Sequence, residues 1–434
     1  MKFERLLRLG LGRAVIRLRE AGGGATFREA VLRACLRDDR YDRQCEEGRE
    51  RFRFDVMAAT GEPEFYRRWL LRATTPGRLR GNDGEQLVAL LRVFAEGGDA
   101  EARARLYTIF AVNAVTERPD GATDIVELDG LAALLFVMPR LVIDADDPCF
   151  ARYLIGIAIE RDGEAAAWAA LAAVADADLV VARLLALVQA DEQRERAGQG
   201  RDAADTGVAS DYPAIRARLR AGERAARRHL WCWARGATAA ELVPVAHDLL
   251  AEDDLQRRNA YLWIFQHRPF PLDHTPLLAL AREPSRRTAA PVISVLAKIE
   301  HNKVRALALE LLAAGRGDGA RLLAANYQAG DYALVERLLL TWTDREELHD
   351  LGFGLHDMVE SHPQLDAHDA LRALYEQGPC SMCRRHTIAL LAELGPLPAW
   401  LVEEYRWDAD HEVRALSNDD RAEVNVDAGS TPSS

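Results

Sequence analysis

Residues 304–312 read Val304-Arg-Ala-Leu-Ala-Leu-Glu-Leu-Leu312. Apolar side chains recur there every three or four positions, the spacing of one buried helix face. Only Ile125-Val-Glu-Leu128 indicates a short strand, and it lies beside turn residues. The chain is therefore predicted to be all-α. The same helical spacing recurs in Gln86–Phe94, Leu106–Val115, Tyr153–Ile159, Leu179–Val188, Leu255–Phe265 and Leu334–Leu340.

Several of these helices follow a polar residue, a short gap and an arginine. The pattern occurs in Asp254-Leu-Gln-Arg257, Glu283-Pro-Ser-Arg286, Asn302-Lys-Val-Arg305 and Asp410-His-Glu-Val-Arg414. Where this pattern leads into Val304–Leu312, the segment resembles the second helix of a HEAT or armadillo repeat. The resemblance implies an α-solenoid, a superhelix of short antiparallel helix pairs that pack only against their neighbours. An irregular helical bundle is the alternative.

One polar stretch, residues 191–212, lacks apolar periodicity and contains several Gly, Ala and charged residues. We interpret it as a helix end followed by a linker, which divides the solenoid into two halves. The predicted parts are a basic N-terminal helical segment (1–80), N-terminal helical repeats (81–196), a linker or loop (197–210), C-terminal HEAT-like repeats (211–420) and a disordered tail (421–434).

The charge of the chain is unevenly distributed. Its 434 residues hold 56 Lys and Arg against 68 Asp and Glu, a net charge of -12. Residues 1–80 carry a net charge of +7, which leaves -19 for the remainder. Nucleic-acid binders need a net basic surface to displace counterions, so the acidity argues against that class. It favours a protein partner, including a basic one that the acidic body would mask.

Arginine outnumbers lysine 53 to 3. We attribute this to the codon usage of a GC-rich, bacterial genome rather than to arginine chemistry. Six cysteines are too few for a disulfide framework. The longest apolar run, Leu131–Met138, is too short to span a bilayer, and arginines interrupt the N-terminal apolar residues where a secretory signal would lie. These features predict a cytoplasmic protein.

The first 19 residues place Phe3, Leu6, Leu7, Val15 and Leu18 on one side and arginines on the other. Such a helix can lie on an anionic membrane surface. Amphipathic helices more commonly face a protein core, and we expect a docked first helix here.

One motif indicates an enzyme. Leu348-His349-Asp350-Leu351-Gly352 resembles the central His-Asp motif of the HD-domain metallophosphohydrolases, which are also all-α. The resemblance implies that His349 and Asp350 bind a divalent metal, which activates water to attack a phosphoester. A further upstream His belongs to that pattern, but the next one here, His301, is distant. Two interpretations therefore stay open: His349 and Asp350 bind a metal, or they are exposed polar residues on a helix.

A second motif, Pro379-Cys380-Ser-Met-Cys383-Arg-Arg-His386, has the spacing of three zinc ligands at a helix start. A closed site needs a fourth ligand, and the chain contains no second CxxC. We therefore predict no resident metal or other cofactor, with Cys380, Cys383 and His386 as the ligands if one is bound. In the alternative, Cys380 lies near the helix N-terminus and Cys383 packs as a small apolar residue.

The densest aromatic cluster comprises Trp231, Trp233, Tyr261, Trp263 and Phe265. At helical spacing such residues usually form core, yet indoles are seldom fully buried, so at least one Trp is expected at the surface. Exposed tryptophans and arginines are frequent anchors for protein partners. The candidate partner-binding residues are Trp231, Trp233, Trp263, Arg257 and Arg258.

The sequence contains neither GxxxxGK[ST] nor GxSxG, and His411-Glu412 lacks the second His of HExxH. Together these observations predict a non-enzymatic helical-repeat protein that binds a protein partner, as an adaptor, assembly factor or antidote. The two alternatives are an HD-like phosphohydrolase and a HEAT-type nucleic-acid-binding or DNA-repair protein.

Overall fold

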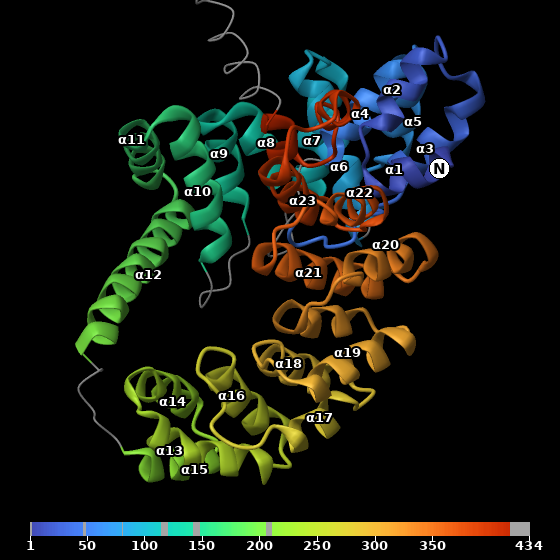
Figure 1. The fold of residues 1–434 in the computed structure, drawn as a ribbon. Coiled ribbons are helices and arrows are strands. Elements are labelled where there is room, and N and C mark those ends of the chain that lie inside the picture. The colour runs from blue at the N-terminus through green and yellow to red at the C-terminus, as the bar shows by residue number, and fades with distance from the viewer. Residues whose placement is uncertain are drawn as a thin grey trace, which may run out of the picture. The chain divides into compact units, whose positions relative to one another are not determined.

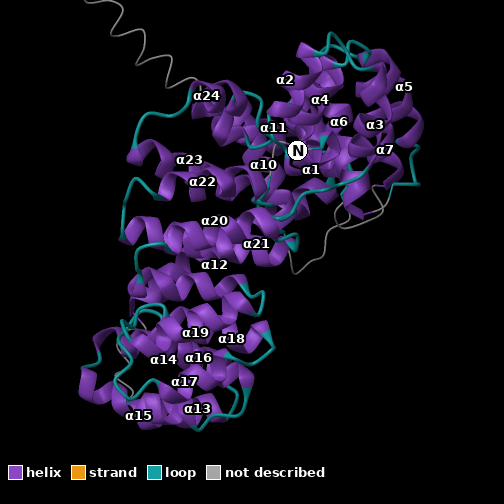
Figure 2. Ribbon diagram, turned by 45° about the vertical axis from the view of Figure 1, so that its right-hand side comes forward, coloured by secondary structure: helices purple, strands orange, loops and turns teal. Residues whose placement is uncertain are grey.

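The computed structural model describes residues 2–46, 49–79, 81–113, 120–141, 148–204 and 211–416. Every regular element in these ranges is a helix, and no strand occurs in them (Figure 2). The all-α prediction is therefore confirmed. Val304–Leu312, which led to it, lies in α19 (Asn302–Ala313), with Val304, Leu307, Ala308 and Leu311 buried.

The helices form two compact units (Figure 1). Unit 1 comprises Met1–Arg201 and Pro398–Ser434, and unit 2 comprises Asp202–Leu397. The helices of unit 1 are α1 (Phe3–Leu9), α2 (Arg13–Glu20), η1 (Ala25–Phe27), α3 (Arg28–Leu36), α4 (Arg49–Ala59), α5 (Pro63–Ala73), α6 (Gly81–Glu96), α7 (Ala100–Asn113), α8 (Ala122–Asp129), α9 (Leu131–Val137), η2 (Met138–Arg140), α10 (Cys149–Asp162), α11 (Glu164–Ala175), α12 (Leu179–Ala204, which crosses into unit 2) and α24 (Ala399–Tyr405).

Unit 2 is built from helices that pack on their near neighbours in the chain. They are α13 (Tyr212–Arg220), α14 (Arg224–Gly236), α15 (Ala239–Leu250), α16 (Leu255–Phe265), α17 (Thr275–Ala281), α18 (Arg286–Leu296), α19, η4 (Gly317–Asn326), α20 (Asp331–Thr341), α21 (Arg345–Ser361), α22 (Ala367–Gln377) and α23 (Ser381–Leu394). One layer runs through α14, α16, α18, η4, α21 and α23, each packing on the next. We call it the α14–α23 layer.

The ten-residue 3₁₀ helix η4 takes a helix position within this layer, between α18 and α21. Glycines allow the close approach. A Cβ on Gly317 would overlap the backbone oxygen of Glu347, and one on Gly354 would overlap Ala320. The layer is therefore tightest where η4 meets α21.

Unit 1 has a comparable layer, in which α2, α4, α6, α8 and α10 pack in succession. The segment around α24 packs on its first helices. Glu404 is 1% exposed and accepts a hydrogen bond from Arg13 Nε at 2.8 Å. The backbone N–H of Ala409 donates to the oxygen of Gly10 at 2.8 Å. These contacts bring the two ends of the described chain together in one unit.

Three sequence-based expectations differ from this arrangement. Residues 398–416, predicted to continue the C-terminal repeats, group with unit 1 because of the contacts of Glu404 and Ala409. Residues 197–204 of the predicted linker are helical in α12; the rest of it, like the predicted tail, lies outside the described residues. The expected strand Ile125–Leu128 lies in α8, where Ile125, Val126 and Leu128 are buried.

The N-terminal apolar residues Phe3, Leu6, Leu7, Val15 and Leu18 are all buried, as expected of a docked segment, but they belong to two helices, α1 and α2, rather than to one. Within the described residues, no helix is both long and apolar enough to cross a membrane.

Candidate functional site

Helices α14 and α16 place an aromatic cluster at the surface of unit 2. The rings of Trp231 and Trp263 stack at 4.6 Å with an interplanar angle of 28°, and exposed His267 lies edge-on to Trp231 at 4.9 Å. Trp263 is 47% exposed, whereas Tyr261 and Phe265 of the same helix are each 1% exposed. The expectation of core residues with at least one surface Trp is confirmed. We call Trp231, Trp263 and His267 the aromatic patch.

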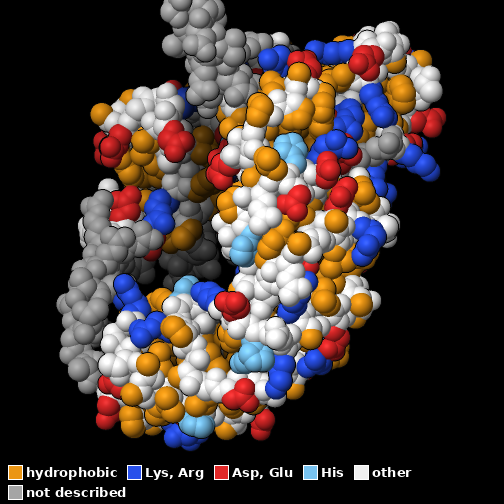
Figure 3. Space-filling view, viewed as in Figure 1, with side chains coloured by type: hydrophobic (Ala, Val, Ile, Leu, Met, Phe, Trp, Pro, Cys, Tyr) orange, Lys and Arg blue, Asp and Glu red, His pale blue; other side chains and the backbone are white. Residues whose placement is uncertain are grey.

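Arginines of α14 flank this patch. Arg227, Arg228 and Arg235 are exposed and lie three or four residues from Trp231, on its side of α14. Neither α14 nor α16 contains Asp or Glu. Basic side chains lie beside hydrophobic ones over these helices in the space-filling view (Figure 3). The patch therefore combines exposed aromatic rings with positive charge.

The other predicted partner-binding residues do not join the patch. Trp233 stacks on Tyr212 of α13 at 5.3 Å. Arg257 pairs with Glu252 at 2.9 Å, and Arg258 donates to the backbone oxygen of Glu252 at 2.9 Å. These three side chains hold neighbouring segments together, which leaves exposed Trp263 and half-buried Trp231 as the candidate contact residues.

The structure separates the two residues of the His-Asp motif. Asp350 accepts a hydrogen bond from Arg286 of α18, and burial raises the pKa of its carboxyl although that guanidinium faces it. His349 points instead to α23, where its Nε2 lies 3.3 Å from Cys383 Sγ. Consecutive helical residues project about 100° apart, so the pair is divided between different neighbours. This geometry gives no support to a shared metal ligand pair.

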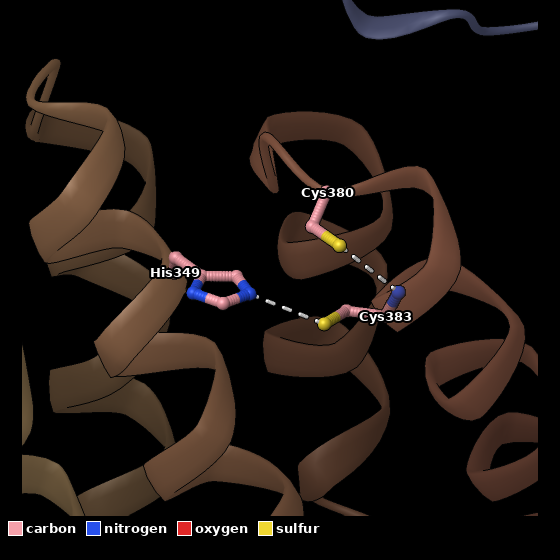
Figure 4. A group of neighbouring side chains, drawn as sticks. All are labelled: His349, Cys380 and Cys383. Carbon is pink, nitrogen blue, oxygen red and sulfur yellow. Dashed lines mark hydrogen bonds between the residues drawn. The ribbon is translucent and has the colours of Figure 1, made fainter. Parts of the chain in front are cut away.

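His349 meets the CxxC motif in a small enclosed cluster (Figure 4). One nitrogen of His349 and the sulfurs of Cys380 and Cys383 all lie within 4.8 Å of one another. Cys380 is the N-cap residue of α23 and is 3% exposed, and its Sγ accepts a hydrogen bond from the backbone N–H of Cys383 at 3.4 Å. The described cysteines form no disulfide. We call His349, Cys380 and Cys383 the thiol–imidazole cluster.

His386, the ligand expected from the sequence, points elsewhere. Its Nε2 lies 2.9 Å from Glu360 Oε1, and its ring lies 4.3 Å from that of His356. His356 is buried and shares a hydrogen bond with Thr387 at 2.9 Å, and burial lowers its pKa to about 3. The histidine beside the two cysteines is therefore His349 of α21 rather than His386 of α23.

Sequence reasoning missed a polar cavity of about 550 Å³ in unit 1. Arg92 of α6 lies beside it and pairs with carboxylates of α4 and α8, with Glu50 at 3.1 Å, Asp124 at 3.5 Å and Glu127 at 3.0 Å. Burial, opposed by Arg92, raises the pKa of Asp124 to about 7. This carboxyl is thus protonated more readily than an ordinary aspartate.

No protein-family model, curated protein or solved structure matches this chain.

Proposed function

We propose that this chain is a non-enzymatic helical-repeat protein that binds a protein partner through the aromatic patch. The observation that carries the proposal is the stack of exposed Trp263 on half-buried Trp231. Tryptophan and arginine are enriched among residues that dominate binding energy, because they bury large areas and still donate hydrogen bonds. The adaptor, assembly-factor and antidote roles are all of this kind, and the cytoplasm of a bacterium is the location that we propose.

A recurring contact supports a repeat architecture of the HEAT or armadillo kind. Arginines donate to carbonyl oxygens at the end of a helix 31–35 residues earlier, in both units. The bonds run from Arg105 to Leu71 and Thr74, from Arg161 to Glu127 and Leu128, from Arg268 to Ala234, Arg235 and Ala237, and from Arg316 to Ala281 and Glu283.

The last carbonyls of a helix lack partners within that helix, and a cation beside them also complements the helix dipole. In all four contacts the arginine lies in, or just after, the helix two further along the chain. Arg105 lies in α7 and reaches the end of α5, and Arg161 lies in α10 and reaches the end of α8. Arg268 and Arg316 lie three residues after α16 and α19 and reach the ends of α14 and α17. Such a contact needs helix ends that lie side by side, as corresponding helices of stacked repeats do. The spacing of 31–35 residues is thus the repeat length that we propose.

The charge around the patch specifies the chemistry of the partner. The chain as a whole is acidic, which suggested a basic partner, but the patch itself is flanked by Arg227, Arg228 and Arg235. A protein segment with an apolar anchor and flanking carboxylates complements this surface. We therefore propose an acidic segment as the part of the partner that contacts α14 and α16.

Affinity capture from the native cell, followed by mass spectrometry, tests this function. The wild type is compared with Trp263→Ala and with the control Trp69→Ala, which removes another exposed tryptophan that also lies near an arginine, Arg72. We expect a stoichiometric partner with the wild type and the control, and its loss with Trp263→Ala. A partner retained equally by all three, or no stoichiometric partner, would contradict the proposal.

A further inference from the structure

The thiol–imidazole cluster has a role that protein binding does not require. We infer that His349 Nε2, Cys380 Sγ and Cys383 Sγ bind one zinc ion that links α21 to α23. Ligands from both helices meet in this cluster, and no other described group of His, Cys, Asp and Glu side chains converges in this way.

The donor set suits zinc. One imidazole nitrogen and two thiolates are soft to borderline ligands that select zinc over calcium or magnesium. In a tetrahedral site with bonds of about 2.0 and 2.3 Å, neighbouring ligand atoms lie about 3.6 Å apart. His349 Nε2 and Cys383 Sγ are 3.3 Å apart, and the whole set lies within 4.8 Å. A shift of about 1 Å at the most distant pair therefore completes three corners of the tetrahedron.

Positive charge lies beside the two cysteines. Both cysteines lie at the N-terminus of α23, a 14-residue helix whose positive dipole end stabilises thiolates. Arg384, which is 2% exposed, lines a small cavity beside the cluster. Thiolate is the form that binds metal, so this charge complements the ligands of the proposed site.

The size of the cavity beside the cluster limits what the site can hold. Its volume is about 10 Å³, room for about one water molecule or ion and far too little for an organic substrate. Phe353, which is 43% exposed, lines the cavity. Three protein ligands leave the fourth position of the ion open, and the metal acts as a cross-link within the α14–α23 layer.

Metal analysis of the reduced full-length protein tests the site. After zinc loading and desalting, we expect about one zinc per chain in the wild type and less than a tenth as much in His349→Gln and Cys383→Ser. Two controls should retain the metal. His386→Gln removes the histidine next to the motif in the sequence, and Cys232→Ser removes an exposed cysteine of α14.

The cobalt(II) form of the wild type provides a readout that does not depend on how the variants fold. We expect tetrahedral cobalt absorption with thiolate charge-transfer bands, and X-ray absorption that fits two sulfur ligands. Failure of the reduced wild type to take up zinc, cobalt spectra without sulfur ligation, or equal uptake by His349→Gln would overturn the inference. Metal loss in His386→Gln alone would do the same. Since the site is distant in the chain from the aromatic patch, none of these results bears on protein binding.

Discussion

Arg268 Nη1 donates a hydrogen bond to the backbone oxygen of Ala234, 34 residues earlier, at 2.7 Å. Its guanidinium also reaches the oxygens of Arg235 and Ala237 and so covers the end of α14. We ascribed the arginine surplus to codon usage. Whatever the origin of this surplus, several arginines lie at helix ends, where their positive charge and their several N–H donors satisfy the last backbone carbonyls.

Replacing this arginine should destabilise unit 2. Arg268→Met keeps the apolar stem but leaves three carbonyls without the guanidinium, and hydrogen bonds from charged groups contribute about 1.5–3 kcal/mol. We expect the free energy of unfolding to fall by about 2 kcal/mol in urea denaturation. The control Arg287→Met alters an exposed arginine of α18 and should change the free energy of unfolding by less than about 0.5 kcal/mol. Equal stabilities of the two variants would contradict the capping role.

The contact of η4 with α21 leaves no room for a methyl group at Gly354. A Cβ there would overlap Ala320, including its backbone. Gly354→Ala should therefore lower the free energy of unfolding by about 1–3 kcal/mol, the usual cost of overpacking. In α10, Gly156 has open space around its Cβ position, so Gly156→Ala should raise it by about 0.5–1 kcal/mol. Thermal or urea unfolding should therefore show changes of opposite sign in the free energy of unfolding of the two variants.

Asp124 should make the stability of unit 1 depend on pH. In the folded state its pKa is raised to about 7, whereas an unfolded aspartate has a pKa of about 3.9. Between these pH values the folded protein therefore binds one more proton than the unfolded chain. That proton stabilises the folded state, and the stabilisation is lost as the pH rises towards 7. Asp124→Asn removes the ionisation, so we expect the variant to be more stable than the wild type at pH 8, by on the order of 1 kcal/mol.

At pH 5 the advantage of Asp124→Asn should be smaller, because the wild-type carboxyl is then protonated. Exposed Asp176, which follows α11 as its C-cap residue, supplies the control, and Asp176→Asn should show no such change between pH 5 and pH 8. A variant less stable than the wild type at pH 8 would indicate that the attraction of Asp124 to Arg92 outweighs its burial.

The helices were predictable from the sequence, but their tertiary pairing was not. The apolar spacing of Val304–Leu312 specifies a helix because each turn must bury the same face. Ile125–Leu128 is too short for periodicity to separate helix from strand. The helix α12 continues to Ala204 because Ala, Glu, Gln and Arg favour helix even without an apolar face. No local pattern reveals that Glu404 pairs with Arg13, almost the whole chain away.

Some residues of the candidate sites were also predictable from the sequence, and others were not. The exposed tryptophan and the CxxC motif were visible as local patterns. His349 was not identified as the third member of the thiol–imidazole cluster, because His386 is closer in the sequence and His349 was assigned to the His-Asp motif. One signal was present. His349 and Cys383 are 34 residues apart, a separation that also recurs in the arginine-to-carbonyl contacts.

Nucleic acid is the competing ligand for an aromatic surface with arginines, since bases stack on exposed rings. We expect tryptophan fluorescence titrations with a single-stranded oligonucleotide to give a dissociation constant no tighter than about 10⁻⁴ M at physiological salt. A tighter complex that weakens steeply with salt and is lost in Trp263→Ala would assign the patch to nucleic acid instead.

The most direct test of the account is the affinity of the purified partner for the full-length chain, measured by calorimetry. Truncating an anchoring tryptophan costs about 2–4 kcal/mol, so Trp263→Ala should weaken binding by roughly 30- to 1,000-fold. The control Trp69→Ala should stay within a factor of about two of the wild type. An unchanged affinity for Trp263→Ala, with the variant folded, would contradict the claim that the aromatic patch binds the partner.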